Sequence, residues 1–152
     1  MSHRQYAIKP TNIDKLNARL LSVSLSKDEK DWQSVFHTHH FTELFFVVNG
    51  EGNFLFHDEK YHIRTGDLVI IPPYMEHTEQ SIKGTPLEYY VIGVEGISFQ
   101  PANKKTCVQV FCNFSNKSLI ADLFAQMLYE VRNPSYGSDK ICQALLEILL
   151  LR

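Results

Sequence analysis

The apolar and polar positions of this 152-residue chain change their period near residue 113. Before that point, short apolar and aromatic runs are separated by turn residues, which is typical of β-strands. The strand-like runs are residues 20–25, 33–37, 43–48, 52–57, 60–63, 68–71, 77–82, 88–94 and 106–111. Turn signals such as Asn-Gly-Glu-Gly at 49–52 and Pro-Pro at 72–73 favour an antiparallel sandwich or barrel. The run 68–71 shows no alternation, so we expect both of its faces to be covered.

Beyond residue 113 the apolar positions follow the period of a helix. One apolar stripe occupies residues 119–131 at the spacing i, i+3, i+4, i+7, and a second helical run follows. Ser115 or Asn116 can cap the first helix, the segment 133–137 ends it, and Ser138 can cap the second. The pattern therefore predicts a helical hairpin.

The second helical run has an unusual end. Residues 145–152 are almost wholly apolar, which is more apolar surface than one small domain easily buries. We expect Leu146, Leu149 and Leu150 to form a twofold homodimer interface. An apolar ending also suggests a piece of a longer protein, since chain termini are usually polar.

Together these patterns predict a mainly β fold, a barrel followed by a C-terminal α-helical hairpin. The barrel with an N-terminal arm is expected over residues 1–112. The helical pair, packed on the barrel and dimerising, is expected over residues 113–152. Hydrophobic residues make up 44% of the chain and charged residues 21%, which excludes a disordered protein.

Charge and cysteine content narrow the class of protein further. The net charge of −2 excludes a basic nucleic-acid-binding footprint over the whole chain. No apolar run is long enough for a membrane span, so we expect no membrane partner. Cys107, Cys112 and Cys142 fit no metal motif and are expected to be small buried side chains in a cytoplasmic protein.

Three histidines and one glutamate have a spacing that can bring them together. His37 and His39 are two residues apart, so on an extended strand they share a face. A short turn lets Glu43 project from the same side, and the turn at 72–73 lets His77 return beside them. Three imidazoles and a carboxylate suit a first-row divalent metal such as zinc, iron, manganese or nickel.

This stretch resembles the two motifs of the cupin superfamily. The first motif is HxH, three residues, E, six residues, G, and it is matched at His37, His39, Glu43 and Gly50. The second begins with G, five residues, PxG, two residues, H, and it is matched at Gly66, Pro72 and His77. The resemblance implies a small β-barrel of the jelly-roll type.

Three positions depart from the cupin motifs. Asp31 stands where the first motif opens with glycine, Tyr74 stands at the glycine of PxG, and Ser81 stands at the closing asparagine. These departures concern turn geometry and leave the ligand set complete.

A narrower resemblance covers residues 36–77, with 66–73 at its centre. This stretch is similar to the N-terminal effector domain of AraC/XylS-type transcriptional regulators. The resemblance implies a cupin barrel, two helices that commonly form the dimer contact, and then a DNA-binding domain with two helix-turn-helix units. Nothing after Ser115 is long or basic enough for that last domain, so we expect it to lie outside this chain.

A pocket for a small-molecule effector is expected inside the barrel. If Glu43 points inward, alternation places Phe45 and Val47 inward as well. The expected pocket residues are His37, His39, Glu43, Phe45, Val47 and His77. Trp32, Tyr89 and Tyr90 are further candidates among which the pattern does not choose, and His40 is out of phase and expected to face outward.

Two functions from different classes remain open. The first is a ligand-sensing, dimerising domain of a transcription regulator, in which the effector biases a flanking segment such as the N-terminal arm. The second is a metal-dependent cupin enzyme, a dioxygenase or isomerase. The helical pair favours the sensor, and the complete ligand quartet favours the enzyme. We identify no catalytic residues, because no nucleophile and base stand in a recognisable arrangement.

Overall fold

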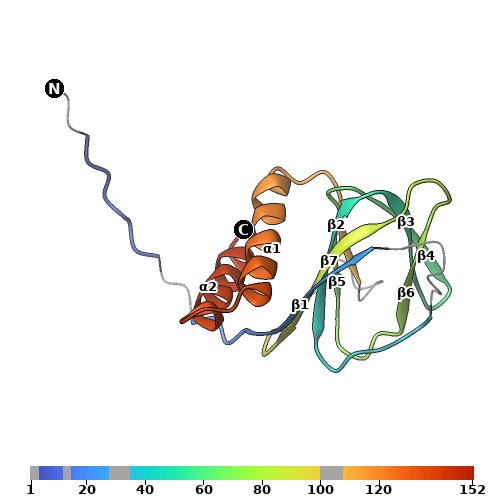
Figure 1. The fold of residues 1–152 in the computed structure, drawn as a ribbon, viewed down its shortest axis with the longest axis horizontal. Helices are drawn as coiled ribbons and strands as arrows, with labels where there is room; N and C mark the ends of the chain where they lie inside the picture. Colours follow the sequence, from blue (N-terminus) through green and yellow to red (C-terminus); the bar gives the residue numbers. More distant parts are fainter. Residues whose placement is uncertain (1–3, 12–14, 28–34, 100–107) are drawn as a thin grey trace.

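A computed structural model of the chain describes residues 4–11, 15–27, 35–99 and 108–152 (Figure 1). The elements in these ranges are β1 (Arg19–Lys27), β2 (Thr42–Asn49), β3 (Glu51–Phe56), β4 (Glu59–Arg64), β5 (Leu68–Ile71), β6 (His77–Ser81), β7 (Glu88–Glu95), β8 (Gln109–Phe111), α1 (Lys117–Arg132) and α2 (Ser138–Leu150). The expectations for Asp31, Trp32 and Cys107, and for parts of the runs 33–37 and 106–111, lie outside the described residues.

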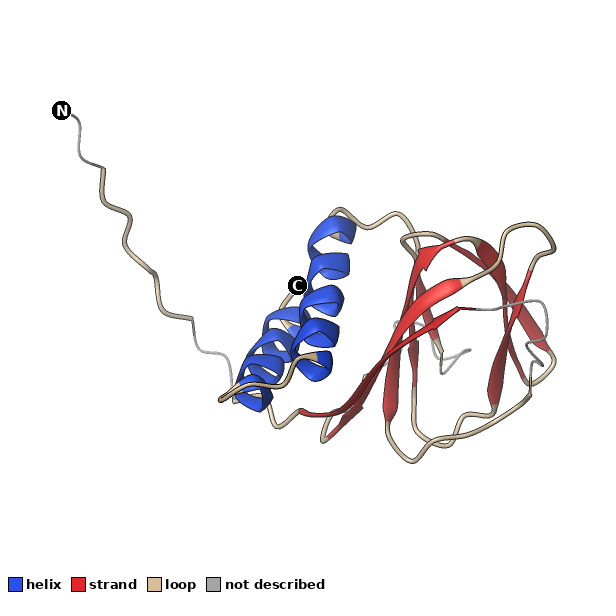
Figure 2. Cartoon of the chain, in the orientation of Figure 1, coloured by secondary structure: helices blue, strands red, loops and turns tan. Residues whose placement is uncertain are grey.

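The strands form two antiparallel sheets (Figure 2). One sheet has the order β1-β7-β2-β5-β8 and the other has the order β4-β3-β6. Among the described residues, the strand hydrogen bonds do not join the two sheets into a closed barrel. They meet instead through an apolar core that includes Phe45, Val69 and Tyr89 from one sheet and Phe54 and Ile63 from the other. In the described residues, side-chain packing is therefore what holds the two sheets of the predicted sandwich or barrel together.

The central strands of the five-stranded sheet are buried on both faces. Along β2, Phe45 and Val47 pack between the sheets, whereas Leu44 and Phe46 belong to a second core beneath the helices. This alternation follows from the two-residue period of a strand. The same division holds for β5, where Val69 faces the other sheet and Ile70 faces the helices, which confirms the expected cover on both faces.

The two helices lie together against the outer face of the five-stranded sheet (Figure 1). Phe124 of α1 is fully buried and stacks on Phe46 and Tyr90 of the sheet. Asn116 is the residue that precedes α1, although its side chain makes no cap hydrogen bond. The expected cap of α2 was wrong, because Gly137 precedes that helix with φ of 87° and Ser138 lies inside it.

The apolar end of α2 does not leave the expected surface free. Leu146 is 0% exposed and Leu149 is 5% exposed, because both pack into the core between the helices and the sheet. Leu150 is partly buried against the same core. Leu146 and Leu149 therefore cannot reach a partner, which corrects the predicted dimer interface. No helix in the described part of the chain is long and apolar enough to cross a lipid bilayer.

Candidate ligand pocket and metal-ligand cluster

The HxH segment is held beside β6 by its backbone. The N–H of His37 donates to the carbonyl of His77, and the N–H of His77 donates to the carbonyl of His37, each over 3.0 Å. Because these residues form a bridge pair, their rings lie with centroids 4.4 Å apart. His39 follows two residues later, and its carbonyl accepts a 2.7 Å hydrogen bond from the N–H of Tyr74.

Glu43, the second residue of β2, joins this group. Its Oε2 lies 3.1 Å from Nε2 of His77, and its Oε1 lies 3.4 Å from Nε2 of His39. Ligand atoms from His37, His39, Glu43 and His77 all lie within 4.8 Å of one another. We call these four residues the quartet.

Two of the imidazoles in the quartet are oriented by backbone carbonyls. Nδ1 of His37 lies 2.9 Å from the carbonyl of Val35, and Nδ1 of His77 lies 2.8 Å from the carbonyl of Met75. In each neutral ring, the Nδ1 that donates to the carbonyl carries the proton, so Nε2 is left with its lone pair. Three imidazole nitrogens and a carboxylate at this separation fit a first-row divalent ion.

The environment of the quartet shifts two of its histidines in opposite directions. Burial lowers the pKa of His39, and the nearby His37 adds to this, although the charge of Glu43 works against it. Burial alone would lower the pKa of His77 as well, but the hydrogen bond to Glu43, the Met75 carbonyl and nearby carboxylate charge outweigh it and raise that pKa. His77 therefore takes up a proton before His39 as the pH falls.

The quartet lines a cavity of about 420 Å³ between the two sheets. The cavity is lined by Ser24, Ser26, Val35, His37, His39, Glu43, Phe45, His77, Thr78, Glu79, Tyr89 and Val91. The structure brings every expected pocket residue to it except Val47, which is fully buried deeper in the core. Tyr90 lies on the opposite face of β7, against Phe124. His40 is exposed.

Residues 22–152 match the family described as the AraC-like ligand binding domain. This chain belongs to that family. The match confirms the predicted resemblance to the effector domains of AraC-type regulators, and the architecture confirms a mainly β, cupin-like fold followed by two helices.

The AraC-like domain also resembles solved structures. Apo ToxT from Vibrio cholerae matches with 11% identity and a TM-score of 0.59, covering 84% of this chain and 51% of ToxT, so the chain spans about half of that protein. A cupin protein from Bacteroides fragilis matches with 18% identity and a TM-score of 0.46, over 62% of this chain and 90% of that one. A cupin-like protein from Thermotoga maritima matches with 24% identity and a TM-score of 0.37, over 38% and 44%. Comparison with curated proteins found no matching relative.

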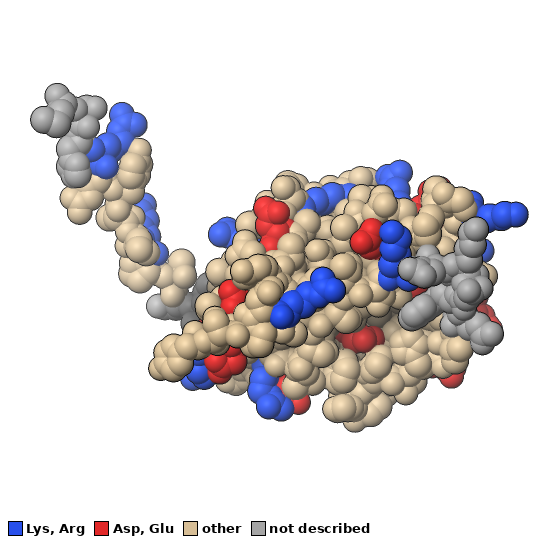
Figure 3. Space-filling view, in the orientation of Figure 1, with Lys and Arg blue, Asp and Glu red and all other residues tan. Residues whose placement is uncertain are grey.

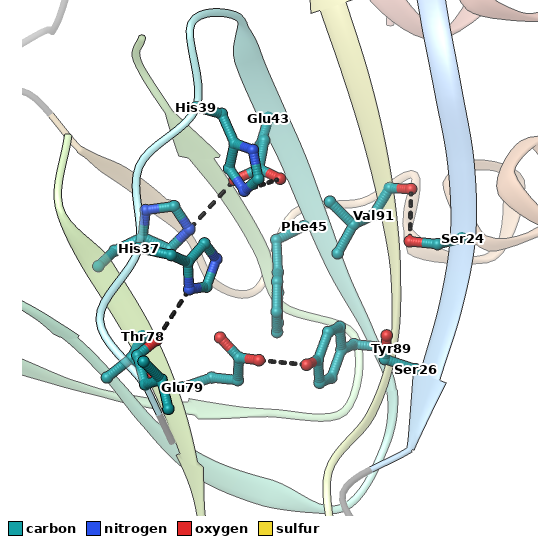
Figure 4. A pocket seen from close by; sticks show the side chains of 12 residues that line it. Ser24, Ser26, His37, His39, Glu43, Phe45, Thr78, Glu79, Tyr89 and Val91 are labelled. Atoms are coloured by element: carbon teal, nitrogen blue, oxygen red, sulfur yellow. Dashed lines mark hydrogen bonds and ion pairs between the residues drawn. The ribbon is translucent and has the colours of Figure 1, made fainter. Parts of the chain in front are cut away.

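Sequence reasoning missed one polar pair in the pocket of the AraC-like domain. The hydroxyl of Tyr89 donates a short hydrogen bond to Oε1 of Glu79, and both residues are buried (Figure 4). A signal was present, because Glu79 follows His77 by two residues on β6 and therefore shares its face. The partner could not be foreseen, because Tyr89 lies on β7 of the other sheet.

Two turns in the cupin motifs of the AraC-like domain need a left-handed backbone. Gly50 has φ of 82°, and a Cβ there would come within 2.1 Å of the carbonyl oxygen of Pro86. Tyr74, which replaces the glycine of PxG, has φ of 63°. An ordinary residue is strained in this region, so the departure at Tyr74 costs stability.

Proposed function

We propose that this AraC-like domain senses a small-molecule effector and dimerises, and that it regulates transcription through a DNA-binding domain carried outside these 152 residues. The observation that carries the proposal is the cavity of about 420 Å³ between the sheets. A regulator of this kind works in the cytoplasm, where its DNA is. No catalytic residue is assigned.

The lining of the cavity is suited to a small organic ligand. Phe45, Val35 and Val91 provide apolar surface, and the quartet adds a few fixed polar groups. Ligand sites generally combine an apolar wall with a small number of oriented polar side chains. A packed core would not place these polar groups around empty space, because buried polar groups need partners.

A path from the pocket to the helices runs through β2. Glu43 and Phe45 face the cavity, while Leu44 and Phe46 pack in the core beneath the helices. A switch requires an effector that binds two states of the protein with different affinity. If the effector binds one position of β2 more tightly than another, it would also shift the surface against which α1 packs.

Dimerisation is assigned to a face of α2 that differs from the one expected from the sequence. Ile141, Ile148 and Leu151 are 43%, 41% and 55% exposed, and Ala144 is exposed between them. We call these four residues the α2 stripe. Their spacing of three and four residues places them on one side of the helix, so a second copy can meet it about a twofold axis.

DNA contact is assigned to the separate domain rather than to this one. On the face drawn in Figure 3, Lys and Arg side chains are interspersed with Asp and Glu over the folded body. The chain has a net charge of −2. A surface that binds DNA by itself needs a concentrated basic patch.

A thermal-shift screen against sugars, organic acids, amines and aromatic metabolites tests the sensing proposal. We expect at least one class to raise the melting temperature of the wild type, because a ligand that binds only the folded state stabilises it. Val91→Phe, which fills the cavity, should abolish that shift, and Val131→Phe on the exposed face of α1 should keep it. A shift that survives in Val91→Phe places binding elsewhere and overturns the proposal.

The quartet supports a second candidate function, a metal-dependent cupin enzyme. Bound at the quartet, a divalent zinc, iron, manganese or nickel ion would supply Lewis-acid or redox chemistry at a position open to the cavity. Elemental analysis of protein prepared without chelator tests this reading. Stoichiometric metal that is lost in His39→Ala, but kept in the control His40→Ala, favours the enzyme.

A further inference from the structure

Glu79 is a buried carboxylate that faces the pocket without a salt bridge among the described residues. Glu79 is 6% exposed, and its carboxylate accepts a hydrogen bond from the hydroxyl of Tyr89. Glu43, the other carboxylate of the pocket, differs because it lies between His39 and His77. The charge of Glu79 acts on His77, two residues away on β6, but no salt bridge joins Glu79 to a cationic side chain among the described residues.

The charge of the lining points in one direction. Among the described residues that line the cavity there are two glutamates, three histidines and no lysine or arginine. A carboxylate out of water is costly unless an opposite charge or several donors compensate it. An anionic ligand would add to this cost, whereas an ammonium group brings a positive charge and three hydrogen-bond donors.

The shape of the pocket complements this charge. Figure 4 shows Glu79 and Tyr89 on the side of the pocket away from His39 and Glu43, with Phe45 between the two polar groups. The ring of Phe45 stacks on that of Tyr89 with centroids 4.1 Å apart. A ligand that reaches Glu79 with its polar end therefore lays its remaining atoms along the apolar wall of Phe45 and Val91.

We propose that the effector is a small amine, whose ammonium group binds the Glu79 carboxylate and whose apolar body lies against Phe45 and Val91. This inference rests on the proposed sensing function and specifies its ligand class. Carboxylic acids of the same size and shape are rejected, because Glu79 repels them and no described lysine or arginine of the lining attracts them.

Three probes with one body and different head groups test the ligand class. Phenethylamine, 2-phenylethanol and phenylacetate are titrated into the wild-type protein by isothermal calorimetry, with EDTA present so that no metal adds charge at the quartet. We expect phenethylamine to bind at least tenfold more tightly than phenylacetate, because a hydrogen bond to a charged group contributes roughly a factor of ten or more. The neutral alcohol should fall between them.

Two variants assign the effect to Glu79. Glu79→Gln keeps the shape of the side chain and removes its charge, so phenethylamine should lose about tenfold in affinity while 2-phenylethanol is unchanged. Unchanged binding of the alcohol also shows that the variant pocket is folded. Glu51→Gln is the matched control, because Glu51 lies on the same sheet and pairs with the exposed His62 outside the pocket.

The inference is overturned if phenethylamine does not bind, if phenylacetate binds as tightly, or if Glu79→Gln leaves the amine preference intact. The sensing function is judged separately by the thermal-shift screen. A sugar or acid that raises the melting temperature in the wild type but not in Val91→Phe would keep the sensor and reject the amine.

Discussion

Among the individual residues of the pocket, Glu43 acts on the pKa of two neighbouring histidines and favours their protonated form. It lies between two imidazoles, and its oxygens face Nε2 of His39 and Nε2 of His77. His77 is the more deeply buried of the two and still has the raised pKa, because its hydrogen bond to Glu43, followed by the one to the Met75 carbonyl, outweighs the effect of burial. The carboxylate therefore compensates the cost of burying a protonated ring.

Replacing Glu43 with glutamine should lower the pKa of His77 in metal-free protein. The substitution removes the negative charge and weakens the hydrogen bond that raise this pKa, and it leaves the burial that lowers it. Histidine-selective NMR titration of the wild type and the variant measures the change. Glu51→Gln serves as the control, and an unshifted His77 in Glu43→Gln would show that another group sets this pKa.

The same pair makes stability depend on pH in a defined direction. Since the folded-state pKa of His77 is raised above its ordinary value of 6.5, its stabilising contribution is fully present below that value. The contribution is lost as the pH rises through the folded-state pKa. Urea unfolding between about pH 5.5 and 8.5 should therefore show the advantage of wild type over Glu43→Gln shrinking as the pH increases. A constant advantage would contradict this.

Tyr74 offers a stabilising substitution at a single position. Tyr74 has a backbone φ of 63° and is 76% exposed, so its side chain contributes little packing. Tyr74→Gly should raise the free energy of unfolding by about 1 kcal/mol, because glycine adopts this conformation without steric cost. Tyr74→Ala keeps the Cβ and should show no such gain in chemical denaturation. Equal gains in both variants would locate the effect in the tyrosine ring.

The quartet could be predicted from spacing alone, and the Glu79–Tyr89 pair could not. Strand period places His37 and His39 on one face, and turn residues return His77 to them. Tyr89 comes to Glu79 from another sheet, which depends on how the sheets pack. Local pattern carries no information about that packing.

At the level of the elements, the attachment of α1 to the five-stranded sheet depends on one aromatic cluster. Phe124 stacks on Phe46 of β2 and Tyr90 of β7, with centroids 5.6 Å and 5.8 Å away. Phe124 is 0% exposed, so its ring fills the space between the helix and two strands. The cluster ties the helical pair to the central strands.

Truncating Phe124 to alanine should therefore destabilise the protein by about 3–5 kcal/mol, since a large buried ring is replaced by a cavity. Tyr129→Ala, on the same helix but 64% exposed, should change stability by less than about 0.5 kcal/mol. Urea denaturation of both variants measures the difference. Similar losses in the two would mean that helix propensity, not the cluster, holds α1 in place.

The helical period predicted both helices, but it could not say which side each would bury. Leu146 and Leu149 were expected to face a partner, and they face the sheet. Leu119 and Val131, at the ends of the stripe of α1, are 38% and 50% exposed. The buried face is chosen by the surface beneath the helix, and that surface is assembled from strands distant in the chain.

For the molecule as a whole, the α2 stripe predicts a dimer that one charge can disrupt. Ile148→Glu puts a carboxylate at the centre of the stripe, so it should convert the dimer to a monomer in light-scattering chromatography. Leu25→Glu, on β1 and 37% exposed, is the matched control and should remain dimeric. A wild type that is monomeric at every concentration tested would contradict the stripe as an interface.

The overall architecture was predictable in its layers but not in how they are connected. Periodicity gives the order of strands and helices and the faces that they bury. It does not determine whether the outer strands of two sheets share hydrogen bonds, because that depends on strand tilt and register. The described residues accordingly form two sheets with a core between them, and hydrogen-bonded closure of a barrel is not seen among them.

The double burial of β2 has a consequence for how a signal would be transmitted. Consecutive residues of β2 face opposite sides of the sheet. Phe45 lines the pocket, and Phe46 packs in the core beneath the helices. The distance between the two is therefore a single peptide unit, about 3.4 Å along the strand. No chain of intermediaries is needed. A ligand that displaces β2 therefore also displaces the surface against which α1 and α2 pack.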